Sequence, residues 1–496
     1  MGALLNFIIK TSIVLSVLLI PLLWSPWTLE VFELSKQYLF LFLVLVGILS
    51  WLARMILVER EVHFKRTPLN LPLLLFAGVM LLSSLFSADW WSSLFGYYGR
   101  FSDGLFGVLA SVGFTFLVIN TVQRPRSLMR PFLVSATIMV LVGYLSLFGV
   151  LQQFPSLPLI AQQVGFTPMA QSLEGFSIFL AFLVSFLALV ALRSEIKLFP
   201  FLGNLVLVCA GFGLLLTTDI LQAWILLLIG LLLVLLSGLF QRALTGAPIR
   251  PRRLWFPVIL LLLTVIFLFS PNKIPGLPEQ LPREPMLSQE TSWSIAFQTL
   301  TDSGKNLFLG SGPGTFALDF SKHKPRDLNQ TPQWQLRFDR AGSHISELLA
   351  TTGILGLLSY LGLFLWFFLV SLFFLKDKRN YPFFFGVMVL FAAQLVHDQG
   401  TVLQVLFWLF LALSVASWEA PKKEFRFFLR RFVEFEIVAK ALLLLFFLAV
   451  GTTFFFGARF LQADMNYLLS HNTARLNLEQ RIDKATNAVE LNPWQV

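Results

Sequence analysis

Thirteen apolar runs, separated by polar loops, constrain the fold of this chain more than any other feature. Each run is about 17–25 residues long, which is enough for an α-helix to cross a bilayer. The chain is 56% hydrophobic and 13% charged, whereas soluble domains are about 45–50% apolar and about 25% charged. The sequence therefore predicts an all-α, polytopic membrane protein with about 13 transmembrane helices. The runs are centred near residues 15, 46, 78, 113, 142, 182, 207, 230, 262, 364, 390, 410 and 448.

The charges of the loops predict how these helices are oriented. Alternate loops are rich in Lys and Arg, and the short loops between them contain almost none. Because cytoplasmic loops collect Lys and Arg, this alternation puts the N-terminus in the cytoplasm and the C-terminus outside. The same rule explains the net charge of +10, so we do not expect nucleic-acid binding. The basic loops lie at 54–66, 124–130, 193–197, 242–253, 376–379 and 422–431.

The apolar runs divide the chain into four parts. Residues 1–270 hold the first nine predicted spans, and 271–352 form one large external loop with short helices. Residues 353–458 hold the last four spans, and 459–496 form an external helical tail. The large loop carries as many acidic as basic residues, which does not conflict with its position because segments longer than about 60 residues are translocated largely regardless of charge.

The tail has the spacing of one helix of a tetratricopeptide repeat. Ala485, Ala488 and Leu491 are followed by Asn-Pro, as in the second helix of such a repeat. A repeat of this kind needs neighbours to bury its apolar face. The tail is therefore either a capping hairpin or the start of a longer array, and we favour the second interpretation.

Polar residues before the tenth apolar run form the first candidate site. If the helix runs back to Arg340, then Arg340, His344 and Glu347 share one face. If Ser343 caps the helix instead, Arg340 lies in the loop above it. Both versions put a guanidinium, an imidazole and a carboxylate at the outer membrane surface, a set that suits phosphate binding and general base catalysis. The alternative is an ordinary polar helix start.

Three further polar features are candidates for a site. The turn 310–314 (Gly-Ser-Gly-Pro-Gly) is either an anion-binding nest or a tight connection, and it lacks the Gly-Lys-Ser/Thr ending of a nucleotide-binding loop. Arg100, beside two tyrosines, is either a second anion contact or a residue of the interfacial aromatic belt. The segment 397–399 (His-Asp-Gln) is expected to face a cavity, because polar groups that face lipid are costly.

No residue pattern requires a metal or a cofactor, and we expect neither. His344, His397 and Asp398 could meet around a metal ion, but no spacing in the sequence demands it. Cys209 is the single cysteine. This excludes an intrachain disulfide and a cysteine-cluster metal site.

Residues 293–356 resemble the signature of the O-antigen ligase/polymerase superfamily of bacterial membrane proteins. The resemblance rests on a Trp-containing helix, a Gly-x-Gly-x-x-x-Phe turn, and an Arg and a His before a helix with Gly-x-x-Gly. The segment around Arg100 also resembles an early Arg-containing loop of that family. In this chain the matching positions are Trp293, Gly310 to Phe316, Arg340, His344, Gly353 and Gly356.

This resemblance implies a glycosyl transfer on the outer face of the cytoplasmic membrane. The donor would be a glycan on a polyprenyl diphosphate, the acceptor a lipid, a protein or another glycan, and no nucleotide, metal or cofactor would take part. It implies that His344 is the base or positions the acceptor hydroxyl, and that Glu347 orients His344. Arg340 and Arg100 would hold the leaving diphosphate, whose developing charge needs fixed cations.

The chain departs from the family at two cationic positions. It has Thr-Asp-Ile-Leu at 218–221 and Glu290 where many members have arginine. We expect Arg283 or Arg337 to take over this role. Three alternatives to a ligase stay open: a polysaccharide polymerase of the same superfamily, a non-enzymatic transporter of lipid-linked glycans, and a scaffold for the tail.

Overall fold

The computed structural model of the chain describes residues 1–169, 172–192, 198–245, 251–269, 281, 283–375, 380–418, 424–429, 433–471 and 476–493. Several predicted loops lie partly or wholly outside these ranges. They include the basic loops at 193–197 and 376–379, parts of the loops at 242–253 and 422–431, and the first part of the large loop at 270–280.

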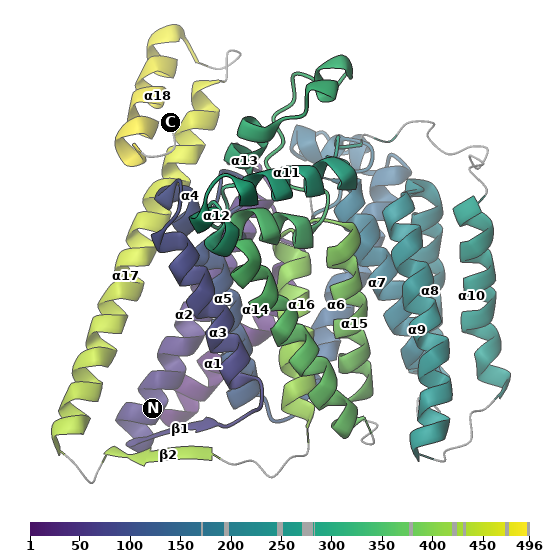
Figure 1. Cartoon of the computed structure of the whole chain (residues 1–496), viewed down its shortest axis with the longest axis horizontal. Helices are drawn as coiled ribbons and strands as arrows, with labels where there is room; N and C mark the ends of the chain where they lie inside the picture. Colours follow the sequence, from purple (N-terminus) through teal and green to yellow (C-terminus); the bar gives the residue numbers. More distant parts are fainter. Residues whose placement is uncertain are drawn as a thin grey trace.

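Long helices stand side by side and run between two ends of the molecule (Figure 1). One end holds α11 to α13 and is called here the α11–α13 end, and the other holds a small antiparallel sheet of β1 (Glu61–Lys65) and β2 (Glu424–Phe428). The two chain termini lie at opposite ends (Figure 1). The helices are α1 (Gly2–Leu19), α2 (Glu33–Ala53), α3 (Asn70–Leu85), α4 (Trp90–Phe95), α5 (Leu105–Thr121), α6 (Met129–Leu147), α7 (Leu173–Ala191), α8 (Leu198–Thr218), α9 (Leu221–Thr245), α10 (Pro251–Phe269), α11 (Gln289–Thr301), α12 (Gly304–Leu309), α13 (Phe316–His323), α14 (His344–Phe374), α15 (Tyr381–Val396), α16 (Thr401–Ser417), α17 (Val433–Ser470) and α18 (Leu478–Leu491).

Eight helical segments in the described part of the chain are long and apolar enough to cross a membrane. Five shorter apolar helices accompany them: α3, α5, α15, α16 and the part of α10 from Leu254 to Phe269. Every one of the predicted centres falls inside one of these helices. A mostly helical protein with long apolar helices is therefore confirmed, although the β1–β2 sheet was not predicted. The number of crossings and their orientation stay predictions. The eight segments are Gly2–Leu19, Glu33–Glu59, Pro125–Leu147, Leu173–Ala191, Phe201–Thr218, Leu221–Gly238, His344–Phe374 and Glu434–Ser470.

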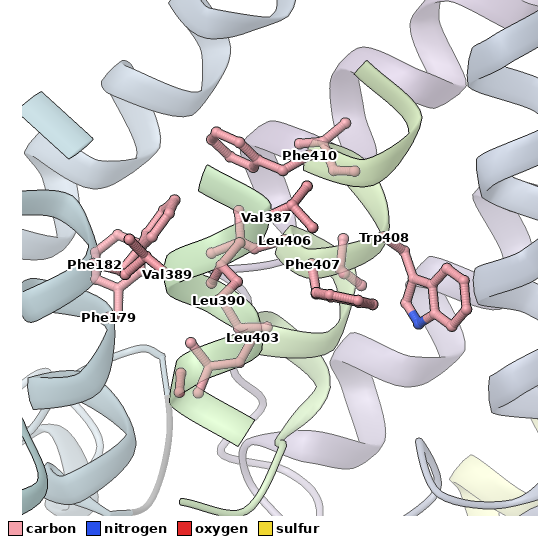
Figure 2. Packing of buried hydrophobic residues seen from close by; sticks show 14 of the residues in the cluster. Phe179, Phe182, Val387, Val389, Leu390, Leu403, Leu406, Phe407, Trp408 and Phe410 are labelled. Atoms are coloured by element: carbon pink, nitrogen blue, oxygen red, sulfur yellow. The ribbon is translucent and has the colours of Figure 1, made fainter. Parts of the chain in front are cut away.

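Helices α7 and α16 form the centre of the bundle. In α7, 94% of the most apolar stretch is buried, and α16 is buried from Thr401 to Val415. The ring of Phe410 on α16 meets Phe182 and Phe186 of α7 edge-on, each at 5.2 Å between ring centres, an arrangement that aromatic pairs favour. Figure 2 shows this core with side chains of α7, α15 and α16. The loop that enters α16 is thus anchored on the best-packed part of the molecule.

Serine caps set the helix starts at the α11–α13 end. Ser343 accepts a hydrogen bond from the backbone N–H of Ser346, so α14 begins at His344. This confirms the second of the two predicted versions, in which Arg340 lies in the loop before the helix. Ser288 and Ser303 cap α11 and α12 in the same way.

Helix α14 is broken at Gly353, where φ is 67°. The break frees backbone carbonyls of the first segment, and the glycine turn 310–314 binds them. Ser311 N–H donates to the carbonyl of Ala350 at 3.2 Å, and Gly312 N–H donates to that of Thr351 at 2.7 Å. Because these donors are already used, the turn is a tight structural connection, and the anion-nest interpretation finds no support.

The last long helix, α17, lies at the edge of the bundle and is mostly exposed: 6% of its most apolar stretch is buried. It continues to Ser470 without a break at 458, so the first part of the predicted tail belongs to the same helix. Near its C-terminal end, Asp464 accepts hydrogen bonds from Leu29 N–H, at 2.7 Å, and from the Tyr98 hydroxyl. These bonds tie α17 to the loops at the α11–α13 end.

Candidate functional site

Two arginines from distant loops meet at one buried aspartate. Arg100, in the loop between α4 and α5, donates a hydrogen bond to Oδ2 of Asp398. Arg340, in the loop before α14, places Nη1 3.5 Å from the same oxygen. Arg100 and Asp398 are each 4% exposed, and Arg340 is 21% exposed. The structure thus brings together the two cations expected to bind an anion.

Further acidic groups surround this pair. Arg340 contacts Glu284 through Nη2 and Asp339 through Nε, each at 3.2 Å. Asp339 is also 3.8 Å from Arg100 Nε, and this Nε makes no hydrogen bond in the described structure. His397 places Nε2 3.2 Å from Oδ1 of Asp398. The result is a compact ion network with an unsatisfied guanidinium donor.

The network keeps Asp398 and the arginines charged despite burial. Burial tends to raise the pKa of Asp398, but the lowering effect of His397 and the two arginines is larger. The pKa of Asp398 therefore lies well below the ordinary value. Burial tends to lower the pKa of Arg100, and Asp398 and Asp339 more than offset this. Burial also lowers the pKa of His397. The two arginines are therefore permanent cations held in place by a permanent anion.

This network forms one wall of a cavity of about 480 Å³ at the α11–α13 end. The lining comes from the α1–α2 connection, the Arg100 loop, the start of α7, the segment before α14 and the loop before α16. Arg337 lines it as well and donates to Ser321 Oγ at 2.9 Å. As predicted for the segment 397–399, His397 and Asp398 face this cavity.

His344 and Glu347 lie at a second, smaller cavity of about 30 Å³. The backbone N–H of His344 donates to the carbonyl of His397 at 3.1 Å, and its ring meets that of Tyr360 at 5.8 Å. Glu347 Oε2 accepts a hydrogen bond from Ala341 N–H at 3.2 Å. The structure thus places both residues behind the arginine network rather than on the wall of the larger cavity.

The structure also tests three other arginines considered from the sequence: Arg100, Arg337 and Arg283. Arg100 is buried, which contradicts its interpretation as a belt residue at the membrane interface, where its guanidinium would reach water. Of the two candidate replacements for missing arginines, Arg337 lines the larger cavity. Arg283 instead lies 3.4 Å from the carbonyl of Asp219, in the turn before α9.

Several site residues were missed from the sequence. No sequence pattern marked Asp339 and Glu284 as site residues, apart from their position in the large loop. Glu30 and Glu33 had a weak signal, since they are carboxylates three residues apart at the start of an apolar run. Tertiary contacts bring all four to the wall of the larger cavity.

The fold and the site together define an α-helical membrane protein with an arginine-rich cavity at one end of its helices. No protein-family model matches the chain, and a search of curated proteins finds none similar to it. The described residues contain no group of three or more His, Cys, Asp or Glu side chains arranged to hold a metal ion.

Proposed function

We propose that this protein is a glycosyltransferase of the O-antigen ligase type. It would move a glycan from a polyprenyl diphosphate carrier to an acceptor hydroxyl on the outer face of the cytoplasmic membrane. The acceptor oxygen attacks the anomeric carbon, the bond from that carbon to the diphosphate oxygen breaks, and the diphosphate leaves. The observation that carries this proposal is the convergence of Arg100 and Arg340 on one cavity.

The arginines of the cavity suit a leaving diphosphate. Guanidinium groups bind phosphate oxygens with paired hydrogen bonds, and fixed cations stabilise charge that develops as a bond breaks. Arg337 adds a third cation to the wall.

An apolar groove beside the cavity suits the lipid part of such a donor. The groove measures about 610 Å³ and lies between α17 and helices α2, α4 and α5. Its lining includes Tyr38, Phe101, Phe456 and Phe460. Phe101 packs edge-on against Tyr98, which lines the arginine cavity, with 5.9 Å between ring centres. The linings of the groove and the cavity therefore touch at the Tyr98–Phe101 contact.

We propose a role for His344 that differs from the two expected from the sequence: it positions the loop that carries Asp398, rather than acting as the base or orienting the acceptor hydroxyl. Its backbone N–H holds the carbonyl of His397, next to Asp398, and its ring lies at the smaller cavity with Glu347. Wild-type transfer by His344→Ala would contradict a direct catalytic role, and it is compatible with positioning through the backbone.

The test is transfer from a polyprenyl diphosphate-linked glycan in reconstituted vesicles. Arg340→Ala should reduce turnover about 10²–10³-fold, as expected for the loss of one group that stabilises developing charge. The matched control is Arg124→Ala, an exposed arginine at the opposite end of the bundle. Equal losses in the two variants would argue against a diphosphate site at Arg340. A transporter or scaffold would release no polyprenyl diphosphate at all.

Mass spectrometry of cell-surface glycans, with and without the protein, separates a ligase from a polymerase. Free chains that accumulate in its absence support the ligase. A change in chain length supports a polymerase acting at the same cavity.

A further inference from the structure

Two glutamates line the larger cavity in addition to the groups of the ion network. Glu30 and Glu33, from the α1–α2 connection and the start of α2, line it together with Arg100 and Arg340. The other carboxylates of the cavity, Asp398, Asp339 and Glu284, form ion pairs with the two arginines. Within the described structure, Glu30 and Glu33 form no such pair with an arginine.

Backbone hydrogen bonds fix the carboxylate of Glu30. Its Oε1 accepts from Phe32 N–H at 3.1 Å, and its Oε2 accepts from Leu34 N–H at 2.5 Å. A carboxylate has about four acceptor sites, so these bonds orient the group and leave room for one more donor. Gly99 packs against it: a Cβ on this glycine would lie 3.7 Å from Glu30 Cγ. Since Gly99 precedes Arg100, the carboxylate lies directly beside the arginine loop.

The surroundings of Glu30 favour proton exchange near neutral pH. Burial, followed by the charge of Glu33, raises its pKa from 4.5 to about 7, although the two backbone N–H groups and Lys36 oppose this. Tyr98, whose hydroxyl donates to Asp464 on α17, and Arg100 line the same cavity as Glu30. A general base works best when its pKa lies near the operating pH.

We propose that Glu30 is the general base of the transfer, a step that rests on the proposed function. The acceptor O–H gives its proton to the Glu30 carboxylate while the acceptor oxygen bonds to the anomeric carbon. The electron pair of the breaking bond goes to the diphosphate oxygen, which Arg100 and Arg340 stabilise. The protonated Glu30 then returns its proton to solvent or to the leaving diphosphate.

The other candidates at the site are less suited to this step. Asp398 is held ionised by two arginines, and a strongly stabilised anion is a poor proton acceptor. Glu33 Oε2 accepts the backbone N–H of Thr401, the first residue of α16, at 3.0 Å, so Glu33 holds two distant helices together. Within the described structure, the Glu30 carboxylate accepts only from its own chain neighbours Phe32 and Leu34. The ring of His344 lies at the smaller cavity, behind the network.

The experiment measures transfer in reconstituted vesicles against pH, and binding of undecaprenyl diphosphate as a separate probe. Wild-type transfer should rise with pH through about 7, because the base must be deprotonated. Glu30→Gln should lower transfer about 10²–10⁴-fold and remove this rise, while the probe binds as before. Glu33→Gln should move the rise to lower pH, because it removes a negative charge that favours protonation of Glu30.

The outcomes separate this proposal from the proposed function. If the wild type neither binds the probe nor transfers glycan, the proposed function fails. If the wild type does both, and Glu30→Gln keeps its rate and pH profile, Glu30 is not the base. If Glu30→Gln does not fold, Glu30→Asp replaces it. A shifted pH rise in that variant supports the proposal, and a lower rate with an unchanged pH profile means that Glu30 only caps α2.

Discussion

Asp398 is the residue on which the geometry of the site depends most. One of its oxygens contacts both Arg100 and Arg340, which come from loops at opposite parts of the sequence. Removing one partner of a buried ion pair leaves an uncompensated charge, which typically costs about 3–5 kcal/mol. Two guanidinium groups could not lie this close without the shared carboxylate. The cationic wall therefore requires this aspartate.

A second buried carboxyl predicts a pH-dependent stability. Asp319 is 5% exposed and accepts a hydrogen bond from Ser311 Oγ at 2.6 Å. Burial raises its pKa from 3.8 to about 7. The folded state thus holds a proton that the unfolded chain loses, so this group's contribution to stability falls as pH rises from about 4 to about 7.

Asp319→Asn should therefore raise the thermal unfolding temperature at pH 8 relative to the wild type, with a smaller difference near pH 4. The measurement is thermal unfolding of the purified protein in detergent across this range. Asp327→Asn, an exposed position in the same loop, is the control and should show little change. A gain that does not vary with pH would contradict the raised pKa of Asp319.

The decisive element is α14, whose break at Gly353 shapes the whole α11–α13 end. The first segment, up to the break, packs with α11 and α13 around Ile295, Phe316 and Leu349. The glycine turn 310–314 fills the gap that the break opens. A straight α14 would leave no place for this turn, and the loop that carries Arg340 would lose its support.

Gly353→Ala should destabilise the protein strongly. With φ 67° and ψ −167°, Gly353 lies in a backbone region that is essentially restricted to glycine, which costs another residue about 1–3 kcal/mol. A Cβ here would also lie 2.6 Å from the backbone carbon of Phe308. Gly362→Ala is the matched control in the same helix, because a Cβ there meets nothing within 4 Å. The control should be neutral or stabilising by up to about 1 kcal/mol. Thermal unfolding in detergent compares the two, and equal effects would refute the role of the break.

For the molecule as a whole, every residue of the arginine cavity lies at one end of the bundle, while the β1–β2 sheet lies at the other (Figure 1). Membrane sidedness therefore decides which solutes the cavity meets. The alternation of basic loops predicts that the α11–α13 end faces outward. A site on the outer face of the membrane has no supply of nucleotide. This fits a donor whose glycan is already activated by its bond to a diphosphate.

Cysteine labelling tests this orientation. In a Cys209→Ser background, Asn329→Cys at the α11–α13 end should react with a membrane-impermeant maleimide added to intact cells. Gln123→Cys, in the exposed connection that follows α5 at the other end, should react only after the cells are opened. The reverse pattern would invert the topology and place the cavity in the cytoplasm.

The sequence alone determined the helices and much of their order. Apolar runs of membrane length can satisfy their backbone groups in lipid only as helices or closed barrels, and runs of this length are helical. Arg340 and His344 could also be predicted as candidate site residues, because they are polar residues beside a predicted helix start. The Ser343 cap could be predicted as one of two versions, since capping depends on nearby residues alone.

Only the tertiary structure decided which polar groups share a cavity. Arg100 and Asp398 are 298 residues apart, and no local pattern records a contact over that distance. The same limit hid Glu30, whose place in the arginine cavity follows from how α2 packs beside α5 and α16. The tertiary structure also places Arg340 and His344 at different cavities. Ser343 caps α14, so Arg340 lies in the loop before the helix and His344 is its first residue. Local propensities specify helices and their ends, whereas the pairing of buried charges depends on how the helices pack.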